Sequence, residues 1–110
     1  MSQRILQIND LIREHLGVIL LREVSFKVGI LVTITKVNTT PDLRHSVISI
    51  STFPEQETDY ALKTIGHEKN RIQTSLHRKL HMKPLPLLSF RSDLTERNAD
   101  VIERLLIELK

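Results

Sequence analysis

The sequence predicts an α+β fold in which helices cover one face of a three-stranded sheet. Several stretches place apolar residues three or four positions apart, the spacing of a helix with one buried side. Three shorter stretches alternate apolar and polar residues, the period of strands in a sheet with one covered face. These elements follow in the order α-β-β-α-α-β-α without a repeat or a linker, so the chain is expected to form a single domain over residues 1–110.

The first helix is predicted over residues 4–22. Its apolar side chains recur at helical spacing and form one stripe, which consists of Ile5, Ile8, Ile12, Leu16, Ile19 and Leu20. Residues 25–29 are expected to form a loop that leads into the sheet.

Two strands are then predicted, over residues 30–37 and 44–52, and a turn over residues 38–42 joins them as an antiparallel hairpin. In the first strand the inward positions are Ile30, Val32 and Ile34, and the outward positions are Thr33 and Thr35. In the second strand the inward positions are Ile48 and Ile50, and the outward positions are Val47, Ser49 and Ser51.

The second half of the chain is predicted to begin with a helix that Pro54 opens. Negative charge in its first turns suits the helix dipole and comes from Glu55, Glu57 and Asp59. After an interruption, a further helix is expected over residues 71–82, with an apolar stripe of Ile72, Leu76 and Leu80. Pro84 and Pro86 end it, residues 87–91 form the third strand, and Asp93 or Thr95 caps a last helix to about Leu109.

The composition excludes several classes of protein. The chain has no cysteine, so it has no disulfide, no thiolate nucleophile and no Cys-ligated zinc. The longest plainly apolar run, residues 18–21, is far too short to cross a bilayer, and no signal peptide is visible. These features suit a reducing cytoplasm, so a cytoplasmic protein without a membrane partner is expected.

Positive charge is concentrated in one region. Six Lys and Arg residues lie within residues 63–83, opposed there only by Glu68, although the net charge of the whole chain is only +3. A helical step of 100° places Arg71, Thr74, Arg78 and His81 on one side of the predicted helix, opposite Leu76, with Lys79 and Lys83 flanking the apolar side. Lys69, Asn70 and Arg71 lie where this helix would begin, a natural phosphate site. Such a cluster attracts polyanions, although a merely solvated helix face is the alternative.

No motif of catalysis is present. The chain lacks a nucleophile elbow, a P-loop and a zincin motif, and its acidic residues are scattered. His77 and His81 have the spacing of a zinc site, but Arg78 and Lys79 between them would repel a cation. We therefore expect neither an enzyme nor a metal, cofactor or small-molecule substrate.

Three segments carry a resemblance to a known family. They are Val-Thr-Ile-Thr-Lys-Val at residues 32–37, Pro-Asp-Leu-Arg at 41–44, and Pro-Leu-Leu-Ser-Phe at 86–90 followed by Asp93. The order of elements is that of a type II KH domain, but the Gly-x-x-Gly loop by which such domains clamp RNA is absent, since no two glycines lie three apart. With this combination the whole chain resembles the ribosome-binding factor A family.

The sequence departs from the family pattern at two places. The family's Ala-x-Gly kink between the central helices corresponds here to Glu68-Lys69-Asn70. Asparagine tolerates the left-handed conformation, so the break is expected at Asn70, with Gly66 as the rival position. The usual acidic-proline turn before the first strand is replaced by Ser-Phe-Lys-Val at residues 25–28.

The resemblance implies an assembly factor, active as a monomer, that binds the small (30S) ribosomal subunit and 16S rRNA. It implies a part in late maturation, in processing of the rRNA ends and in growth in the cold. Combined with the charge pattern, it gives as candidate RNA-binding residues Lys36, Arg44, Lys63, Lys69, Asn70, Arg71, Arg78, Lys79 and Lys83. The alternative is a protein-interaction module whose basic face docks an acidic partner.

Overall fold

The computed structural model describes residues 3–82 and 85–93. Its elements are α1 (Gln3–Glu23), β1 (Leu31–Thr39), β2 (His45–Phe53), the 3-10 turn η1 (Glu55–Glu57), α2 (Thr58–His67), α3 (Lys69–Leu80) and β3 (Leu87–Ser92). The predicted α+β class and the three strands are confirmed, and the expected last helix lies outside the described residues. The helix expected to open at Pro54 begins as η1 and becomes α-helical at Thr58.

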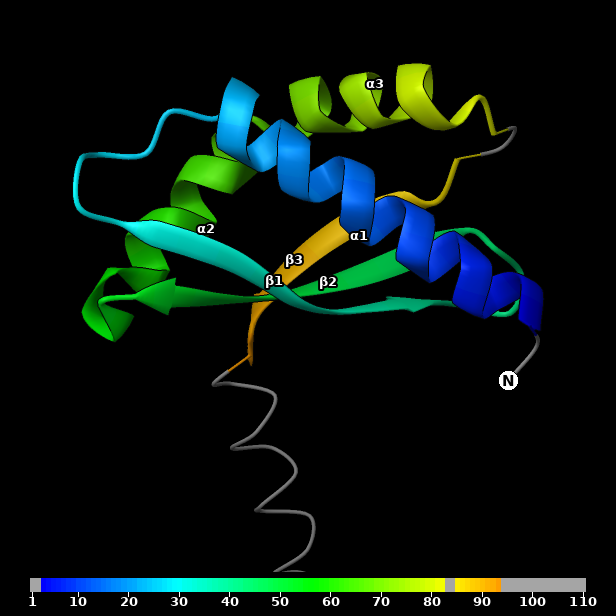
Figure 1. Ribbon diagram of the computed structural model, residues 1–110, viewed down its shortest axis with the longest axis horizontal. Coiled ribbons are helices and arrows are strands. Elements are labelled where there is room, and N and C mark those ends of the chain that lie inside the picture. Colours follow the sequence, from blue (N-terminus) through cyan, green and yellow to red (C-terminus); the bar gives the residue numbers. More distant parts are fainter. Residues whose placement is uncertain (1–2, 83–84, 94–110) are drawn as a thin grey trace, which may run out of the picture.

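The strands form one mixed sheet in the order β1-β2-β3 (Figure 1). β1 and β2 pair antiparallel and form the hairpin that the sequence predicted, and β3 pairs parallel to β2. The parallel pair is possible because α2 and α3 form the long crossover between β2 and β3.

One hydrophobic core joins the sheet to all three described helices. It contains Ile12 and Leu16 from α1, Ala61 and Ile65 from α2, Ile72 and Leu76 from α3, and Ile48, Ile50 and Leu88 from the sheet. Since these strand residues share one face, the described helices cover the same side of the sheet, as the alternation predicted.

β1 contains a bulge that the alternation did not predict. The pairing with β2 shifts between Ile34 and Lys36, so Thr35 is the extra residue. The shift moves the inward positions from Val32 and Ile34 to Val37 and Thr39. Two contacts satisfy Thr35: its hydroxyl donates to the Ser49 carbonyl, 3.2 Å away, and its own carbonyl accepts from the Arg13 guanidinium of α1.

A buried polar contact helps to place α1 on the hairpin. The Thr39 hydroxyl donates to the Asn9 side-chain oxygen at 2.6 Å and lies 2.8 Å from the Ser46 hydroxyl, which can donate to it in turn. Because Asn9, Thr39 and Ser46 are all buried, these hydrogen bonds offset the cost of removing the groups from water.

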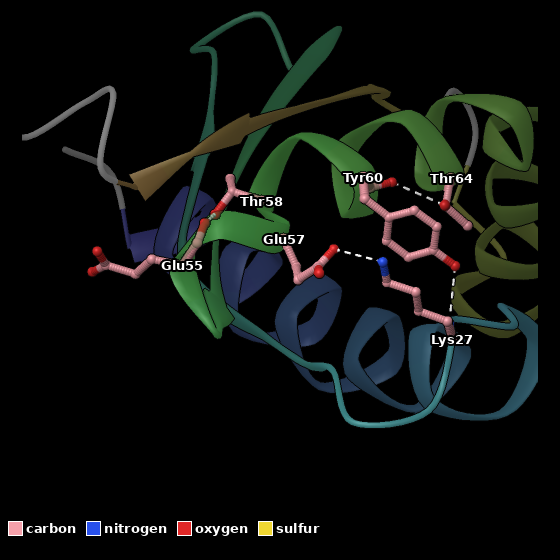
Figure 2. A network of polar contacts seen from close by, with 6 residues as sticks. All are labelled: Lys27, Glu55, Glu57, Thr58, Tyr60 and Thr64. Atoms are coloured by element: carbon pink, nitrogen blue, oxygen red, sulfur yellow. Dashed lines mark hydrogen bonds and ion pairs between the residues drawn. The ribbon is translucent and has the colours of Figure 1, made fainter.

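The loop between α1 and β1 is fixed to the start of α2, as Figure 2 shows. The Lys27 ammonium lies 2.9 Å from a Glu57 carboxylate oxygen and 4.7 Å from the centre of the Tyr60 ring. The Lys27 backbone N–H donates to the Tyr60 hydroxyl at 2.9 Å. One lysine therefore joins the two segments through its backbone and its side chain.

The helical break lies at Glu68. This residue has φ −98° and ψ 8°, ends α2 and begins α3. The break falls within the predicted Glu68-Lys69-Asn70 segment, but the expectation of a left-handed Asn70 is wrong, because Asn70 lies inside α3 and φ is negative there. A departure in ψ at Glu68 is enough to redirect the chain, so no left-handed residue is needed.

Candidate nucleic-acid interface

Five of the nine candidate residues lie on α3. They are Lys69, Asn70, Arg71, Arg78 and Lys79, and all five are exposed. The buried side of the same helix consists of Ile72 and Leu76, as the sequence predicted. The helix therefore separates its positive charge from its packing surface.

The C-terminal end of α3 differs from the prediction. The helix ends at Leu80, and His81 adopts a left-handed conformation with φ 50° while its N–H donates to the His77 carbonyl at 3.1 Å. His81 therefore does not continue the side of Arg71, Thr74 and Arg78. Because His81 lies beyond the last helical residue, His77 and His81 do not have the relative placement of two residues four apart within a helix.

α1 packs beside α3 (Figure 1) and adds Arg22, a cation that the sequence alone did not single out. Glu23, the last residue of α1, accepts a 2.8 Å hydrogen bond from the Ser75 hydroxyl of α3. This contact brings the end of α1, with Arg22 and His15, against the basic side of α3.

Two neighbouring hollows result. The larger, of about 430 Å³, is lined by Glu23, Asn70, Arg71, Thr74, Ser75 and Arg78. The smaller, of about 250 Å³, is lined by His15, Val18, Ile19, Arg22, Glu23 and Lys79. We call this surface the α1–α3 basic face and define it by Arg22, Asn70, Arg71, Arg78 and Lys79.

The ion pair between Arg71 and Glu68 on this face is weak. The Arg71 guanidinium lies 3.9 Å from a Glu68 carboxylate oxygen, and the two side chains are 62% and 38% exposed. An exposed pair at this distance contributes well under about 1 kcal/mol. Arg71 can therefore exchange Glu68 for a phosphate at little cost.

The first turn of α3 also favours an anion. It contains Lys69, Asn70 and Arg71 and no acidic residue, and the Glu68 side chain makes no capping hydrogen bond. A helix start carries partial positive charge, and the side chains of Lys69 and Arg71 add to it.

Gln73 fixes α3 relative to the sheet. Its side-chain amide donates to the Pro86 carbonyl at 2.8 Å, and its side-chain oxygen accepts from the Leu88 N–H at 3.1 Å. One side chain therefore satisfies two backbone groups, one just before β3 and one within it, and links α3 to the edge of the sheet.

Replacing Gln73 with alanine is expected to destabilise the protein by about 1–3 kcal/mol, because two partly buried backbone groups lose their partners. Urea unfolding followed by circular dichroism measures the change. The control is Gln56→Ala, which truncates an exposed glutamine and is expected to change stability by less than about 0.5 kcal/mol. Equal midpoints for the two variants would contradict this role of Gln73.

The remaining candidates lie elsewhere. Lys63 is exposed on α2, Lys36 pairs in register with Ser49 on the sheet, and Arg44 precedes β2. None of these three residues lines either hollow. Lys83 lies outside the described residues.

The hairpin turn holds Arg44 in place through Asp42. The pKa of Asp42 lies below its usual value, first because the Thr40 hydroxyl donates a hydrogen bond to its carboxylate and second because the Arg44 backbone N–H does so. The Arg44 carbonyl accepts from the Leu87 N–H at 2.8 Å, which ties the turn to β3.

The residues that the structure describes form neither a metal site nor a membrane span. Within residues 3–82 and 85–93, no three His, Asp or Glu side chains gather closely enough to hold a metal ion. None of the helices described there is both long and apolar enough to cross a membrane.

Comparison with known proteins gives one consistent family. Residues 4–106 match the family model described as ribosome-binding factor A. A protein of that name from Syntrophobacter fumaroxidans is 32% identical over 106 residues, which cover 94% of this chain and 91% of the relative.

Solved structures of that family share the fold. The crystal structure of ribosome-binding factor A from Thermus thermophilus has a TM-score of 0.68 at 20% identity, covering 80% of this chain and 93% of that one. A model of the Thermus thermophilus factor, fitted into a cryo-EM map of its complex with the 30S subunit, has a TM-score of 0.62 at 22% identity and covers 76% and 88%. The shared fold therefore includes most of the residues described above.

Proposed function

Because this chain belongs to the ribosome-binding factor A family, we propose that it is an assembly factor that binds the small (30S) ribosomal subunit and its 16S rRNA. The observation that carries the proposal is the α1–α3 basic face, where cations from two helices line adjoining hollows. A Thermus thermophilus member of the family was fitted into a map of its 30S complex, which supports the same partner here.

Phosphate groups are the chemical target of this face. Arg71 and Arg78 share one hollow, and Arg22 and Lys79 share the other, so each hollow offers two cations to an RNA backbone. Contacts of this kind position a protein on RNA without reading bases, so recognition rests on the shape of the folded RNA. Lys36, Arg44, Lys63 and Lys83 are proposed as further contacts outside the basic face.

The proposed factor acts by binding alone, as a cytoplasmic monomer without a cofactor or a reaction of its own. It shifts a population of RNA conformers by binding one of them more tightly. A preference of about 1.4 kcal/mol already changes the ratio of two conformers tenfold. The factor must later leave the subunit, so moderate and salt-sensitive affinity suits this role.

The proposed role lies late in maturation of the small subunit and in processing of the rRNA ends, with the greatest need in the cold. RNA helices gain stability as temperature falls, so misfolded precursors escape more slowly. A protein that favours the mature conformer then has a larger effect.

Depletion of the protein tests this role. Depleted cells grown in the cold are expected to accumulate free small subunits with unprocessed rRNA ends, seen in a sucrose gradient and by mapping those ends. In undepleted cells, the protein is expected to sediment with free small subunits and not with full ribosomes. Normal subunit ratios and mature ends at low temperature would contradict the role and favour docking to an acidic protein.

A further inference from the structure

Glu23 is an acidic residue in the middle of the α1–α3 basic face. It lines both hollows, and among the described residues that line them it is the only one with a carboxylate. Its side chain is partly buried, and the 2.8 Å hydrogen bond from Ser75 holds the carboxylate at the boundary between the hollows. A negative charge is therefore fixed between Arg71 and Arg78 on one side and Arg22 and Lys79 on the other.

Helix stability does not explain this position. Glu23 is the last residue of α1, and the C-terminal end of a helix carries partial negative charge that disfavours a carboxylate. The hydrogen bond to Ser75 needs only an acceptor oxygen, which a neutral glutamine also provides. The negative charge is exposed enough to solvent for its effect on the stability of the free protein to be small, so its larger effect is on the anions that this face binds.

We propose that Glu23 is a specificity-determining residue that divides the basic face into two separate phosphate sites. The site lined by Arg71 and Arg78 holds one phosphate, and the site lined by Arg22 and Lys79 holds the other. The carboxylate between them repels any phosphate that lies across the boundary. The inference rests on the proposed binding of ribosomal RNA.

The consequence is selection by backbone shape. A folded RNA that presents phosphates at both sites avoids Glu23, whereas a flexible polyanion that spreads across the face meets its charge. Specificity is a difference between affinities, and a repulsive group raises it by weakening the wrong complex. At roughly 6 Å, in a surface dielectric near 20 and with physiological screening, one like charge changes affinity on the order of tenfold.

The test is Glu23→Gln, which removes the charge and keeps the acceptor for Ser75. Dissociation constants are measured for purified small subunits and for single-stranded oligo(U), the flexible polyanion. The variant is expected to bind oligo(U) on the order of tenfold more tightly and small subunits at most about threefold more tightly. The affinity for small subunits divided by the affinity for oligo(U) is therefore expected to fall. An unchanged or larger value of this ratio would overturn the proposal.

Glu68→Gln is the matched control. It removes an acidic charge 3.9 Å from Arg71, but Glu68 lies outside both hollows. It is expected to tighten the binding of small subunits and of oligo(U) by similar small factors, and to leave the ratio of the two affinities unchanged. If Glu68→Gln lowers the ratio as much as Glu23→Gln, the effect is one of net charge and the inference is wrong.

The failure of this inference is distinguishable from failure of the proposed function. Reversal of Arg71 and Arg78 measures whether small subunits bind at the basic face at all. If that double reversal weakens binding while Glu23→Gln leaves the affinity ratio unchanged, only the inference fails. If the double reversal has no effect on small-subunit binding, the proposed binding surface fails whatever Glu23 does.

Discussion

Reversing the charge at Arg71 and Arg78 together is expected to weaken binding to small subunits on the order of a hundredfold. Both guanidinium groups line the larger hollow, so the variant loses two phosphate contacts and adds repulsion in their place. Binding of the variant also releases fewer counterions, so the negative slope of log affinity against log salt becomes less steep by about 1.5. Binding measured at several salt concentrations gives both quantities.

The fold of the double variant is expected to survive. Both side chains are exposed, and the buried face of α3 consists of Ile72 and Leu76. Arg71→Glu places a carboxylate three residues after Glu68, and this repulsion lowers the stability by a few tenths of a kcal/mol. Arg78→Glu places a carboxylate near the C-terminal end of α3, where the helix dipole disfavours it by about 0.3–1 kcal/mol. These costs are small beside the about 5–15 kcal/mol by which domains are stable.

The matched control reverses Lys36 and Arg44 on the hairpin. It makes the same change in net charge, but neither residue lines the α1–α3 hollows. Because Lys36 and Arg44 are proposed as further contacts outside the basic face, the hairpin variant is expected to lose some affinity, but less than the α3 variant. The opposite order, with both proteins folded, would move the binding surface to the hairpin side of the molecule.

The sequence was most informative where short-range periodicity determines structure. The alternation in β2 places Ile48 and Ile50 inward, and the helical stripe places Ile72 and Leu76 inward, as the structure shows. Each pattern depends only on the geometry of one element and on the exclusion of apolar side chains from water. Such features need no knowledge of the rest of the chain.

Where the prediction fell short, local backbone geometry decided the outcome. At the bulge at Thr35, the inward positions change from even-numbered residues, ending with Ile34, to odd-numbered residues, starting with Val37. A strand predicted to end at Val37 contains too few residues after the bulge to show this change. Glu68 has no special preference for the conformation at the break. Histidine is one of the few non-glycine residues enriched in the left-handed region, so His81 was an available signal that the helix prediction to residue 82 did not use.

The candidate site could be predicted only in part, because it spans two helices that are distant in sequence. The charges on α3 were visible as a cluster, but Arg22 and His15 join them through the packing of α1 on α3. The available signal was the spacing of His15 and Arg22, two turns apart and beside the apolar stripe of α1. Nothing in that spacing tells which helix lies opposite, so tertiary structure was required.

Leu76→Ala is expected to destabilise the protein by about 2–5 kcal/mol. Leu76 is 0% exposed and packs in the core from α3, directly behind the basic face. The substitution removes apolar contacts and leaves a cavity, and the gain in helix propensity from alanine, under about 0.5 kcal/mol, does not compensate. Thermal unfolding is expected to shift downward by on the order of 10 °C for a domain of this size.

The matched control is Leu21→Ala, the same truncation at a leucine that is 81% exposed. It is expected to change stability by less than about 0.5 kcal/mol, since little apolar surface is removed from water there. Comparison with the charge reversal then separates two contributions of α3. Leu76→Ala is expected to lower stability, while the molecules that remain folded keep their affinity for small subunits. Reversal of Arg71 and Arg78 is expected to lower that affinity and to leave stability nearly unchanged. Similar unfolding midpoints for Leu76→Ala and Leu21→Ala would contradict the assignment of α3 to the core.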